Sequence, residues 1–557
     1  MFQLAANQQF QNHRPRVFVL RDPKTTANEL LDGRYDFVIT SYAHLRGQYS
    51  RKIRYESYIR DGPSDKHKGL IKRPILSLLS AIYRIFKLPF KHVILDEVQM
   101  AKNSDSLTHK AISCLFYQSV VMLSGTFIAN TWLDSFSPIH FIPGHPFTSL
   151  GEFVRVFGSK QGEKIVPPVP TRKDRLVKFL MGFTVMRPKT YLEIPESNRH
   201  VWRFFLNDSE ACKVLYFVQK YFEACRRQSI RITEELVGSS KGRVLLGYIT
   251  RAQQHAAHPL LADSAEKANF KDLESMGFQI RLDYQAQIKS HNENDIDYLD
   301  FLNWLRKSSI TRDAENFENP EDAKDNEDDP ADPDYRDDNN NLSDDADDTG
   351  SIVPDEDEGS DVELEYRRKT SGRTKWKARV QGLDKQELIS SRLIAIKDLV
   401  GKERNKKMII SSKFLLFLDL VFEMLRREFN ISAIDFNGSL DDDERRQATD
   451  RFQGGGEGAV ILLTPGAGGI GINLRTAEVV IQCEDWWTVA EEAQLWSRAH
   501  GEGQQNPVDY YLIRGLNSLA ELVILERKEH KARVNAEIMG PLLRRDDEAP
   551  VIPAILK

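Results

Sequence analysis

Short apolar runs alternate with segments of helical spacing along most of the chain. The first series occupies residues 16–20, 36–40, 92–95 and 120–123, and each run ends at turn-forming or polar residues. A second series follows at 407–412, 432–436, 459–464, 479–483 and 508–513. Buried strands that alternate with helices are typical of parallel sheets. The pattern therefore predicts an α/β protein with two parallel-sheet lobes.

The segments between these runs predict helices. The clearest apolar stripe extends from Leu70 to Leu88, where apolar residues recur at the spacing of one helix face. Residues 203–305 also have mainly helical spacing and lie between the two series of strands. We expect this middle region to be a helical insertion.

Charge is distributed unevenly along the chain. Residues 312–365 contain 24 Asp or Glu and three basic residues, a balance of −21, so the other 503 residues carry +16 within a net charge of −5. A segment with so few large apolar residues cannot bury enough surface to offset its chain entropy, and we expect an acidic disordered linker. The basic excess elsewhere is compatible with nucleic-acid binding or with ordinary solvation of the surface.

A basic cluster surrounds Trp376 directly after the acidic segment. Its members are Arg367, Arg368, Lys369, Arg373, Lys375, Lys377 and Arg379. Such a cluster is typical of phosphate contacts with DNA or of a nuclear import signal, and a solvated flank is the alternative.

Several classes of protein are excluded by composition. Apolar residues make up 41% and charged residues 29%, which is ordinary for a chain with sizeable cores. No apolar stretch is long enough to span a membrane, and the first residues lack the pattern of a secretory signal. The four cysteines are scattered without a Cys-x-x-Cys pair, so we expect no disulfide framework, no zinc and a reducing compartment.

Two adjacent carboxylates, Asp96 and Glu97, follow the apolar run at 92–95 directly. Ligands of parallel sheets lie beyond the carboxyl ends of the strands. A pair of carboxylates at that edge suits an Mg²⁺-nucleotide site, where one positions the metal and the other orients the attacking water.

The order and spacing of longer motifs resemble those of the Swi/Snf-type family of helicase-like remodelling ATPases. In the first half, the similar segments are YDFVITSY (35–42), DEVQMAKN (96–103), LSGTFIANTWLDSFSPIHFI (123–142) and RAQQHAAHPLL (251–261). In the second half, they are KMIISSKFLLFLDLV (407–421), DFNGSLDDDERRQATDRFQ (435–453), TPGAGGIGINL (464–474) and EDWWTVAEEAQLWSRAHGEGQ (484–504). The resemblance covers about residues 16–305 and 390–540.

This resemblance implies two RecA-like lobes that hold Mg-ATP between them and step along double-stranded DNA. By position, it assigns Asp96 and Glu97 to Mg²⁺ and water activation, and the helix at 516–539 to bracing of the lobes. The remaining assignments are a coupling motif (Ser124, Gly125, Thr126), a glycine-rich approach to the nucleotide (Gly468, Gly469, Gly471) and two side chains facing the nucleotide (Gln494, Arg498). Arg498 would stabilise phosphate charge.

Two departures from the family pattern concern phosphate binding. No G-x-x-x-x-G-K-[ST] loop, which supplies the backbone cradle and the lysine for the terminal phosphates, occurs in the sequence. The segment Lys24-Thr25-Thr26 is a poor substitute, because Asp22 adds negative charge and Pro23 has no N–H to donate, and we interpret it as a helix start. Gly501 occupies the position of the family's second arginine finger. In the family the phosphate loop precedes the segment like RVFVL, so the chain is expected to begin after it.

Other substitutions lie in the second lobe. Pro465 and Gly466 replace a threonine and a basic residue, and Thr488-Val489 replaces Asn-Pro.

Without the strand that feeds the phosphate loop, we expect unpaired strand edges and exposed apolar side chains in the first lobe. That lobe is then expected to be unstable or prone to aggregation by itself, while residues 390–540 fold.

The sequence thus predicts an incomplete first lobe (1–200), a mainly helical region (201–311), an acidic linker with a basic end (312–372), a second lobe with its bracing helix (373–540) and a tail (541–557). We expect a nuclear member of the DNA-dependent ATPase and translocase family, acting in chromatin remodelling or DNA repair on DNA or nucleosomes. Its ATP hydrolysis is expected to be impaired. The alternative is a non-catalytic scaffold that binds DNA or chromatin.

Overall fold

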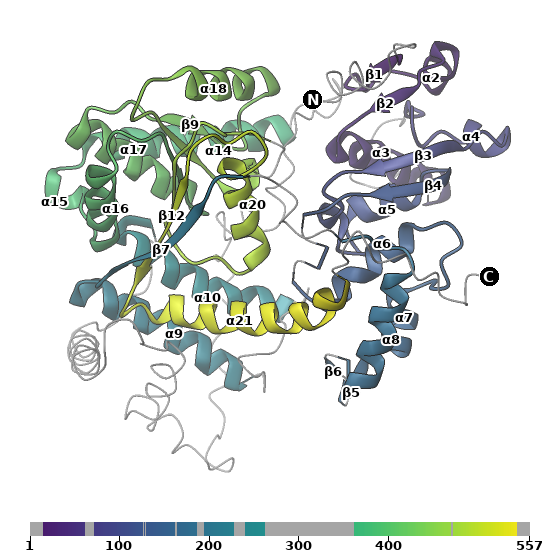
Figure 1. The fold of residues 1–557 in the computed structure, drawn as a ribbon. Helices are drawn as coiled ribbons and strands as arrows, with labels where there is room; N and C mark the ends of the chain where they lie inside the picture. Colours follow the sequence, from purple (N-terminus) through teal and green to yellow (C-terminus); the bar gives the residue numbers. More distant parts are fainter. Residues whose placement is uncertain are drawn as a thin grey trace. The chain divides into compact units, whose positions relative to one another are not determined.

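The structure is a computed structural model that describes residues 15–61, 72–125, 127–128, 130–161, 164–166, 168–186, 194–227, 240–261, 361–468 and 472–542. The chain divides into two compact units (Figure 1). Unit 1 comprises residues 1–191, 348–364 and 533–557, and unit 2 comprises residues 192–347 and 365–532. The segment predicted to be a disordered acidic linker lies outside the described residues up to position 360.

Unit 2 is built on a six-stranded sheet in which every neighbouring pair is parallel. Its strands are β7 (Ser197–Phe204), β8 (Met408–Ser411), β9 (Ile434–Phe436), β10 (Val460–Leu463), β11 (Val479–Gln482) and β12 (Val508–Gly515). Their order across the sheet is β7-β12-β11-β8-β10-β9. The five strands predicted from the second series of apolar runs are confirmed.

Successive residues of the central strands face opposite sides of this sheet, and helices cover both sides. Met408 and Ile410 pack with α16 (Ser391–Lys402) and α17 (Leu415–Phe429), whereas Ile409 packs with α18 (Asp442–Gly454) and α20 (Val489–Ala499). Every residue of β8, β10 and β11 is buried. The continuous apolar runs in the sequence follow from this burial on both faces.

Strand β7 was not predicted. It follows the first series of strands in the sequence, yet it pairs with β12 over eight residues and forms one edge of the unit 2 sheet. The remaining helices of this unit are α9 (Asp208–Arg227), α10 (Ser240–Ala257), α14 (Asp361–Gly382, whose first residues belong to unit 1), α15 (Lys385–Leu388), α19 (Pro465–Gly468) and the first part of α21 (Leu519–Met539). Apolar residues of α9 and α10 pack with Ala520, Val523 and Ile524 of α21.

Unit 1 contains its predicted strands in two separate pieces. Strands β1 (Val17–Val19) and β2 (Phe37–Ile39) pair in parallel, and so do β3 (Phe90–Leu95) and β4 (Tyr117–Met122). Among the described residues, neither pair continues into a larger sheet; a third piece is the antiparallel hairpin of β5 (Ser159–Gln161) and β6 (Lys164–Val166). The expectation of an incomplete first lobe is confirmed.

One face of these short sheets is covered and the other is not. Leu20 and Leu95 are buried in the core, and Val93, Val120 and Met122 pack against it. The alternate residues Val19, Ile94, Val121 and Leu123 are each between 47% and 49% exposed. We call these four residues the open apolar face of unit 1.

The helices of unit 1 are short, apart from α3. They are α2 (Ala27–Gly33), α3 (Tyr42–Asp61), α4 (Ile82–Ile85), α5 (Leu107–Ser113), α6 (Phe136–Phe141), α7 (Leu150–Phe157) and α8 (Pro170–Met181). Trp132, Phe153 and Phe157 form an aromatic core between α6, α7 and α8, which also includes Ile538 and Leu542 from the end of the chain.

The helix predicted for residues 70–88 is wrong over most of its described part. Only α4 forms, and residues 72–79 have no helical backbone. Pro74 disfavours a helix before it, and the buried amide of Gln48 satisfies the backbone instead: its Oε1 accepts from the N–H groups of Leu78 (3.0 Å) and Leu79 (3.4 Å). Of the described apolar residues of this stripe, Leu78 and Leu79 are buried in a non-helical segment, whereas Ile75, Ile85, Phe86 and Leu88 are exposed.

No helix among the described residues is both long and apolar enough to cross a membrane. Within the same residues, no group of three or more His, Cys, Asp or Glu side chains is arranged to hold a metal ion.

Candidate functional site

The carboxylates of Asp96 and Glu97 lie just beyond the carboxyl end of β3. Asp96 is exposed and Glu97 is half-buried, with a left-handed backbone (φ 49°). Gln99 fixes the Glu97 carboxylate, because its Nε2 donates to Glu97 Oε2 at 2.6 Å. The other end of the same amide, Oε1, accepts a hydrogen bond from Ser124 Oγ at 2.6 Å. A continuous chain of hydrogen bonds therefore joins Glu97 to the predicted coupling motif.

Backbone contacts hold this arrangement in place. The N–H of Val98 donates to the carbonyl of Leu123 at 3.0 Å, and the N–H of Leu123 donates to the carbonyl of Leu95 at 2.8 Å. Tyr42, at the start of α3, donates its hydroxyl to the carbonyl of Asp96 at 2.8 Å. Burial, followed by the charges of Asp96 and Glu97, raises the pKa of Tyr42 well above its usual value, so it remains a donor.

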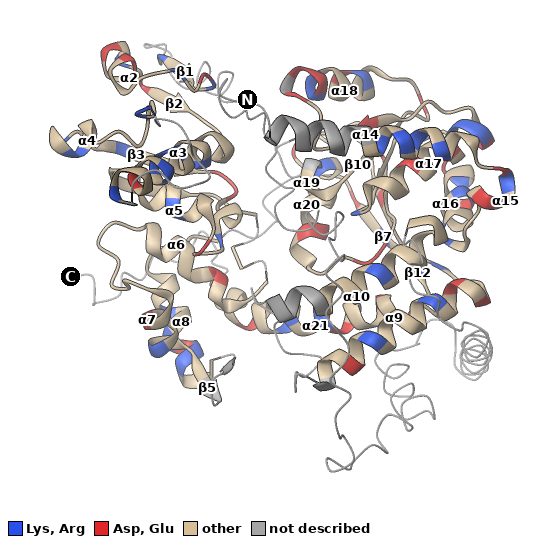
Figure 2. Ribbon diagram, turned by 180° about the vertical axis from the view of Figure 1, so that it is seen from behind, with Lys and Arg blue, Asp and Glu red and all other residues tan. Residues whose placement is uncertain are grey.

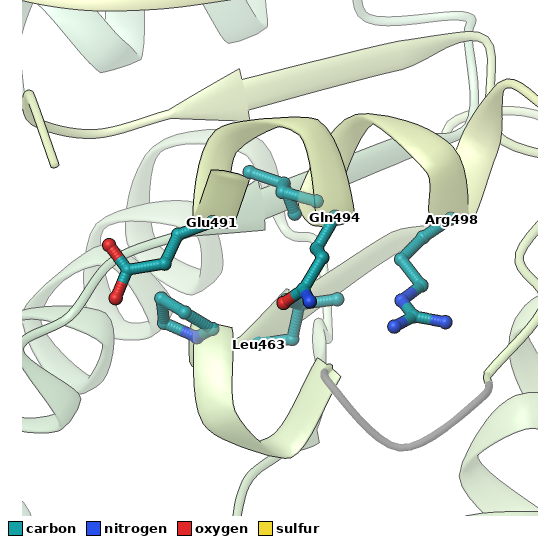
Figure 3. A pocket seen from close by; sticks show the side chains of 6 residues that line it. Leu463, Glu491, Gln494 and Arg498 are labelled. Atoms are coloured by element: carbon teal, nitrogen blue, oxygen red, sulfur yellow. The ribbon is translucent and has the colours of Figure 1, made fainter. Parts of the chain in front are cut away.

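In unit 2, helix α20 carries the side chains predicted to face a nucleotide. Gln494 and Arg498 are one turn apart and extend from the same side of the helix into a small pocket that Glu491, Leu463 and Pro465 also line (Figure 3). Arg498 is only 8% exposed, and its guanidinium Nη1 donates to the carbonyl of Ile472 at 3.4 Å. A guanidinium presented at a pocket wall suits recognition of an anion.

Two of the substitutions in this region leave the local structure intact. Thr488 caps α20, since its Oγ1 accepts from the N–H of Glu491 at 3.3 Å, so it keeps the role that an asparagine would have there. Gly501 has a backbone conformation open to other residues, and a Cβ at this position would meet only the Ser497 carbonyl at 3.4 Å. Nothing in the fold therefore requires glycine at position 501.

A buried network of charged groups is connected to α20 through Glu492. Asp485 accepts two hydrogen bonds of 2.7 Å from the Arg514 guanidinium and one of 2.7 Å from Lys528 Nζ. Lys528 also donates to Glu492 Oε1 on α20 at 2.7 Å, and Gln482 donates to the same oxygen at 3.1 Å. Burial opposes ionisation of Asp485, but the charges of Arg514 and Lys528 outweigh it and lower its pKa to about 2.

Part of the basic cluster around Trp376 is used inside unit 2. Arg373 on α14 binds Asp419 of α17 (2.7 Å) and Asp435 of β9 (2.7 Å), and Lys377 also reaches Asp435 (3.1 Å). Figure 2 shows this basic stretch of α14 beside α17. Burial raises the pKa of Asp419, whereas at Asp435 the Arg373 charge outweighs burial and lowers the pKa. Arg373 and Lys377 therefore anchor the helix.

Replacing Arg373 with Ala should loosen α14. The change leaves the nearly buried Asp419 and the partly buried Asp435 with Lys377 as the only described residue that forms an ion pair with them, so we expect a loss of about 2–4 kcal/mol in the free energy of unfolding of unit 2. Urea unfolding and trypsin cleavage between α14 and α16 measure this loss. Lys375→Ala, at an exposed position of the same helix, is the control and should change little. Equal effects of the two variants would contradict the anchoring role.

Other predicted residues are placed as follows. Thr126, Gly469 and Gly471 lie outside the described residues, while Gly125 lies in the loop after β4 and Gly468 ends α19. Thr26 begins α2 as its N-cap, with its Oγ1 accepting from the N–H of Glu29 at 3.2 Å. Its reading as a helix start is confirmed.

Sequence reasoning missed three groups of this region. Gln99 was included only as part of the segment DEVQMAKN, and Tyr42 only as the last residue of the segment YDFVITSY. Neither was assigned a role. Asp485, Arg514 and Lys528 form no spacing pattern in the sequence, because their ion network joins strands and helices that are distant along the chain. The acidic pair Glu484-Asp485, which follows the buried run 479–483, was the one available hint.

Comparison with known proteins places both halves of the chain. An SNF2-related domain model matches residues 6–261, and a helicase conserved C-terminal domain model matches residues 391–503. The DNA repair protein RAD5 of Yarrowia lipolytica is 25% identical over 506 residues, which cover 82% of this chain and 45% of that protein.

Two further relatives agree. An uncharacterized ATP-dependent helicase of Schizosaccharomyces pombe is 24% identical over 560 residues, covering 92% of this chain and 52% of that protein. The human chromodomain-helicase-DNA-binding protein 1 is 35% identical over 146 residues, 26% of this chain and 8% of that protein. The chain thus spans about half the length of the Yarrowia RAD5 protein and of the Schizosaccharomyces helicase.

Proposed function

Because the chain belongs to the SNF2-related, helicase-like ATPase family, we propose that it acts on double-stranded DNA in repair or chromatin remodelling and that its 557 residues hydrolyse ATP weakly or not at all. The observation that carries the proposal is a mismatch between two sets of residues. Asp96 and Glu97, which we assign to the metal, and Arg498 are present, whereas the sequence has no loop to cradle terminal phosphates and has Gly501 at the second arginine position.

The carboxylate half of the site fits Mg²⁺. Asp96 offers an exposed oxygen donor, and the Gln99 amide holds Glu97 beside it, which suits a hard cation that prefers carboxylate and water ligands. Bound there, Mg²⁺ would neutralise phosphate charge; Asp96 would hold it and Glu97 would orient a water molecule. We assign Arg498 to phosphate charge and Gln494 to positioning.

The phosphate half does not fit. In phosphoryl transfer the backbone cradle and its lysine fix the terminal phosphates, and an arginine finger contributes about 10³–10⁵-fold to the rate. Lys24-Thr25-Thr26 offers no replacement, because Thr26 caps α2 and the Asp22 carboxylate accepts from the N–H of Lys24 at 2.8 Å. We therefore derive no hydrolytic step for these residues.

Phosphate release measured with duplex DNA tests the proposal. We expect the protein and its Glu97→Gln variant to release phosphate at the same background rate, since the step that Glu97 serves is already lost. Gly501→Arg, which the backbone admits, should not restore turnover alone. Release that duplex DNA stimulates and that Glu97→Gln abolishes would show an active ATPase and contradict the impairment.

The second candidate is a DNA- or chromatin-binding scaffold in the nucleus. The balance of +16 outside residues 312–365 favours it. A scaffold of this kind binds duplex DNA with an affinity that falls steeply with salt and ignores ATP. Titration of a fluorescent duplex at several salt concentrations, with and without Mg-ATP, distinguishes the two, because a nucleotide-coupled protein changes its DNA affinity when Mg-ATP is added.

A further inference from the structure

A groove with aromatic walls lies on unit 2, away from α20. It has a volume of about 350 Å³, and residues of strand β7 and helix α16 line it. Figure 1 shows where these two elements lie in unit 2. Trp202, Phe204 and Phe205 line it on the strand side, and Ile394 and Asp398 line it on the helix side. Ile394 is 45% exposed. This volume falls in the range of pockets that hold a side chain or a small ligand.

The groove runs along the free edge of a sheet. Among the described strands, β7 pairs only with β12, and its first five residues are all exposed. The carbonyls of Glu196 and Phe204 accept hydrogen bonds from the N–H groups of Val508, which begins β12, and of Leu516, which directly follows it. Because backbone groups alternate in direction along a strand, those of Arg199 and Val201 point to the outer edge. An unpaired edge of this kind is a template for another strand.

Two charged side chains line the groove, Arg203 on the strand side and Asp398 on the helix side, and Arg203 already has an interaction partner in the structure. Asp398 is exposed, and the structure gives its carboxylate no ion pair with any described residue. Lys402, one turn further along α16, is already engaged: its Nζ lies over the rings of Trp202 and Tyr511 and 3.7 Å from Glu403 Oε1. A ligand that fills the groove would therefore meet Asp398 with a cation.

We propose that β7 and this groove form a docking site for an extended segment of a partner protein. The segment adds to the edge of β7 as a further strand, inserts one large apolar side chain between Phe204 and Ile394, and pairs a lysine or arginine with Asp398. Backbone pairing supplies affinity and the groove supplies specificity, as in other cases of strand addition. A nucleic acid fits less well, because the Asp398 carboxylate on the helix side repels phosphate.

A synthetic peptide tests the proposal on the whole protein. The probe is acetyl-Thr-Val-Phe-Thr-Lys-Val-Thr-amide, in which Phe and Lys are two residues apart and so lie on one face of a strand. We expect saturable binding by fluorescence anisotropy, and an affinity at least about tenfold weaker for Phe→Ser and Lys→Glu peptides. A peptide with N-methyl groups along one backbone edge should not bind, since it cannot pair. These peptide controls leave the protein unchanged.

Protein variants locate the site. Asp398→Lys and Ile394→Asn, both at exposed positions, should weaken binding by about tenfold or more. Asp450→Lys, which makes the same charge change at an exposed position of α18, should leave it unchanged. The proposal is overturned if the probe fails to bind at about 1 mM, or if Asp398→Lys and Asp450→Lys act equally. It is also overturned if Ile394→Asn abolishes self-association in sedimentation, because the occupant would then be a second copy.

Discussion

Replacing Asp485 with Asn is expected to lower the free energy of unfolding of unit 2 by about 3–5 kcal/mol. The side chain is fully buried and is the common partner of Arg514 and Lys528, which are themselves nearly buried. Asparagine has almost the same volume but no charge, so Arg514 and Lys528 would both lose the charge of Asp485 in a site of low dielectric constant, while Lys528 would keep its ion pair with Glu492. Urea unfolding followed by circular dichroism measures the loss.

Asp450→Asn is the matched control, since Asp450 is exposed on α18, and it should change stability by less than about 0.5 kcal/mol. A second variant, Lys528→Met, keeps most of the side-chain packing but removes the charge. If the ion pair stabilises unit 2, the double variant Asp485→Asn/Lys528→Met should lose less free energy of unfolding than the two single variants together. A small loss in Asp485→Asn, comparable with that of the control, would contradict this account.

The same carboxylate predicts how stability depends on pH. Its pKa is about 2 in the folded chain against an ordinary 3.8, so the unfolded chain binds the proton first as the pH falls. The contribution of Asp485 is therefore complete above about pH 4–5 and is lost between there and pH 2. Asp485→Asn should show a correspondingly weaker dependence over that interval.

The second large effect is expected in unit 1. Its open apolar face exposes four aliphatic side chains, and burying each is worth about 1.5–3 kcal/mol. We expect the protein to self-associate through this face, to bind a hydrophobic dye and to lose unit 1 first to chymotrypsin. Replacing Ile94 and Val121 with Thr, which keeps strand propensity, should reduce the self-association and the dye binding together.

Ile59→Thr is the comparison variant, because Ile59 is an exposed apolar residue on α3 that does not belong to the open face. It should leave self-association unchanged. Light scattering and dye fluorescence at several concentrations measure both properties. A cooperative, protease-resistant unit 1 that remains monomeric would show that the face is not exposed in solution.

The strands that form from the two series of apolar runs could be predicted because each is a short apolar segment bounded by turn-forming or polar residues. In unit 2 the runs at 407–412 and 479–483 became fully buried strands, as continuous apolar residues require. Strand β7 escaped detection because five of its eight residues are exposed and polar or charged residues predominate, which is how an edge strand looks. The helix predicted for residues 70–88 does not form over residues 72–79. Pro74 disfavours a helix before it, and the Gln48 amide accepts the hydrogen bonds of the Leu78 and Leu79 N–H groups.

The candidate site was predicted in its parts but not in its connections. Asp96 and Glu97 lie at the end of β3, and Gln494 and Arg498 line a pocket on α20, where motif position had put them. Their catalytic roles stay predictions. The links Glu97–Gln99–Ser124 and Asp485–Lys528–Glu492 could not be read from the sequence, since each depends on side-chain directions across elements far apart in the chain.

The amide of Gln99 is used at both ends, and this restricts what position 99 can hold. Its nitrogen must meet a carboxylate while its oxygen meets a hydroxyl. A glutamate differs by a single atom, yet it would set two anions 2.6 Å apart at an oxygen that needs a donor. A methionine, which is of similar length, has no N–H to donate and would leave the Glu97 carboxylate without this partner. Position 99 therefore needs a side chain that donates a hydrogen bond to Glu97 and also accepts one from Ser124. Such a side chain holds the two residues in a fixed arrangement.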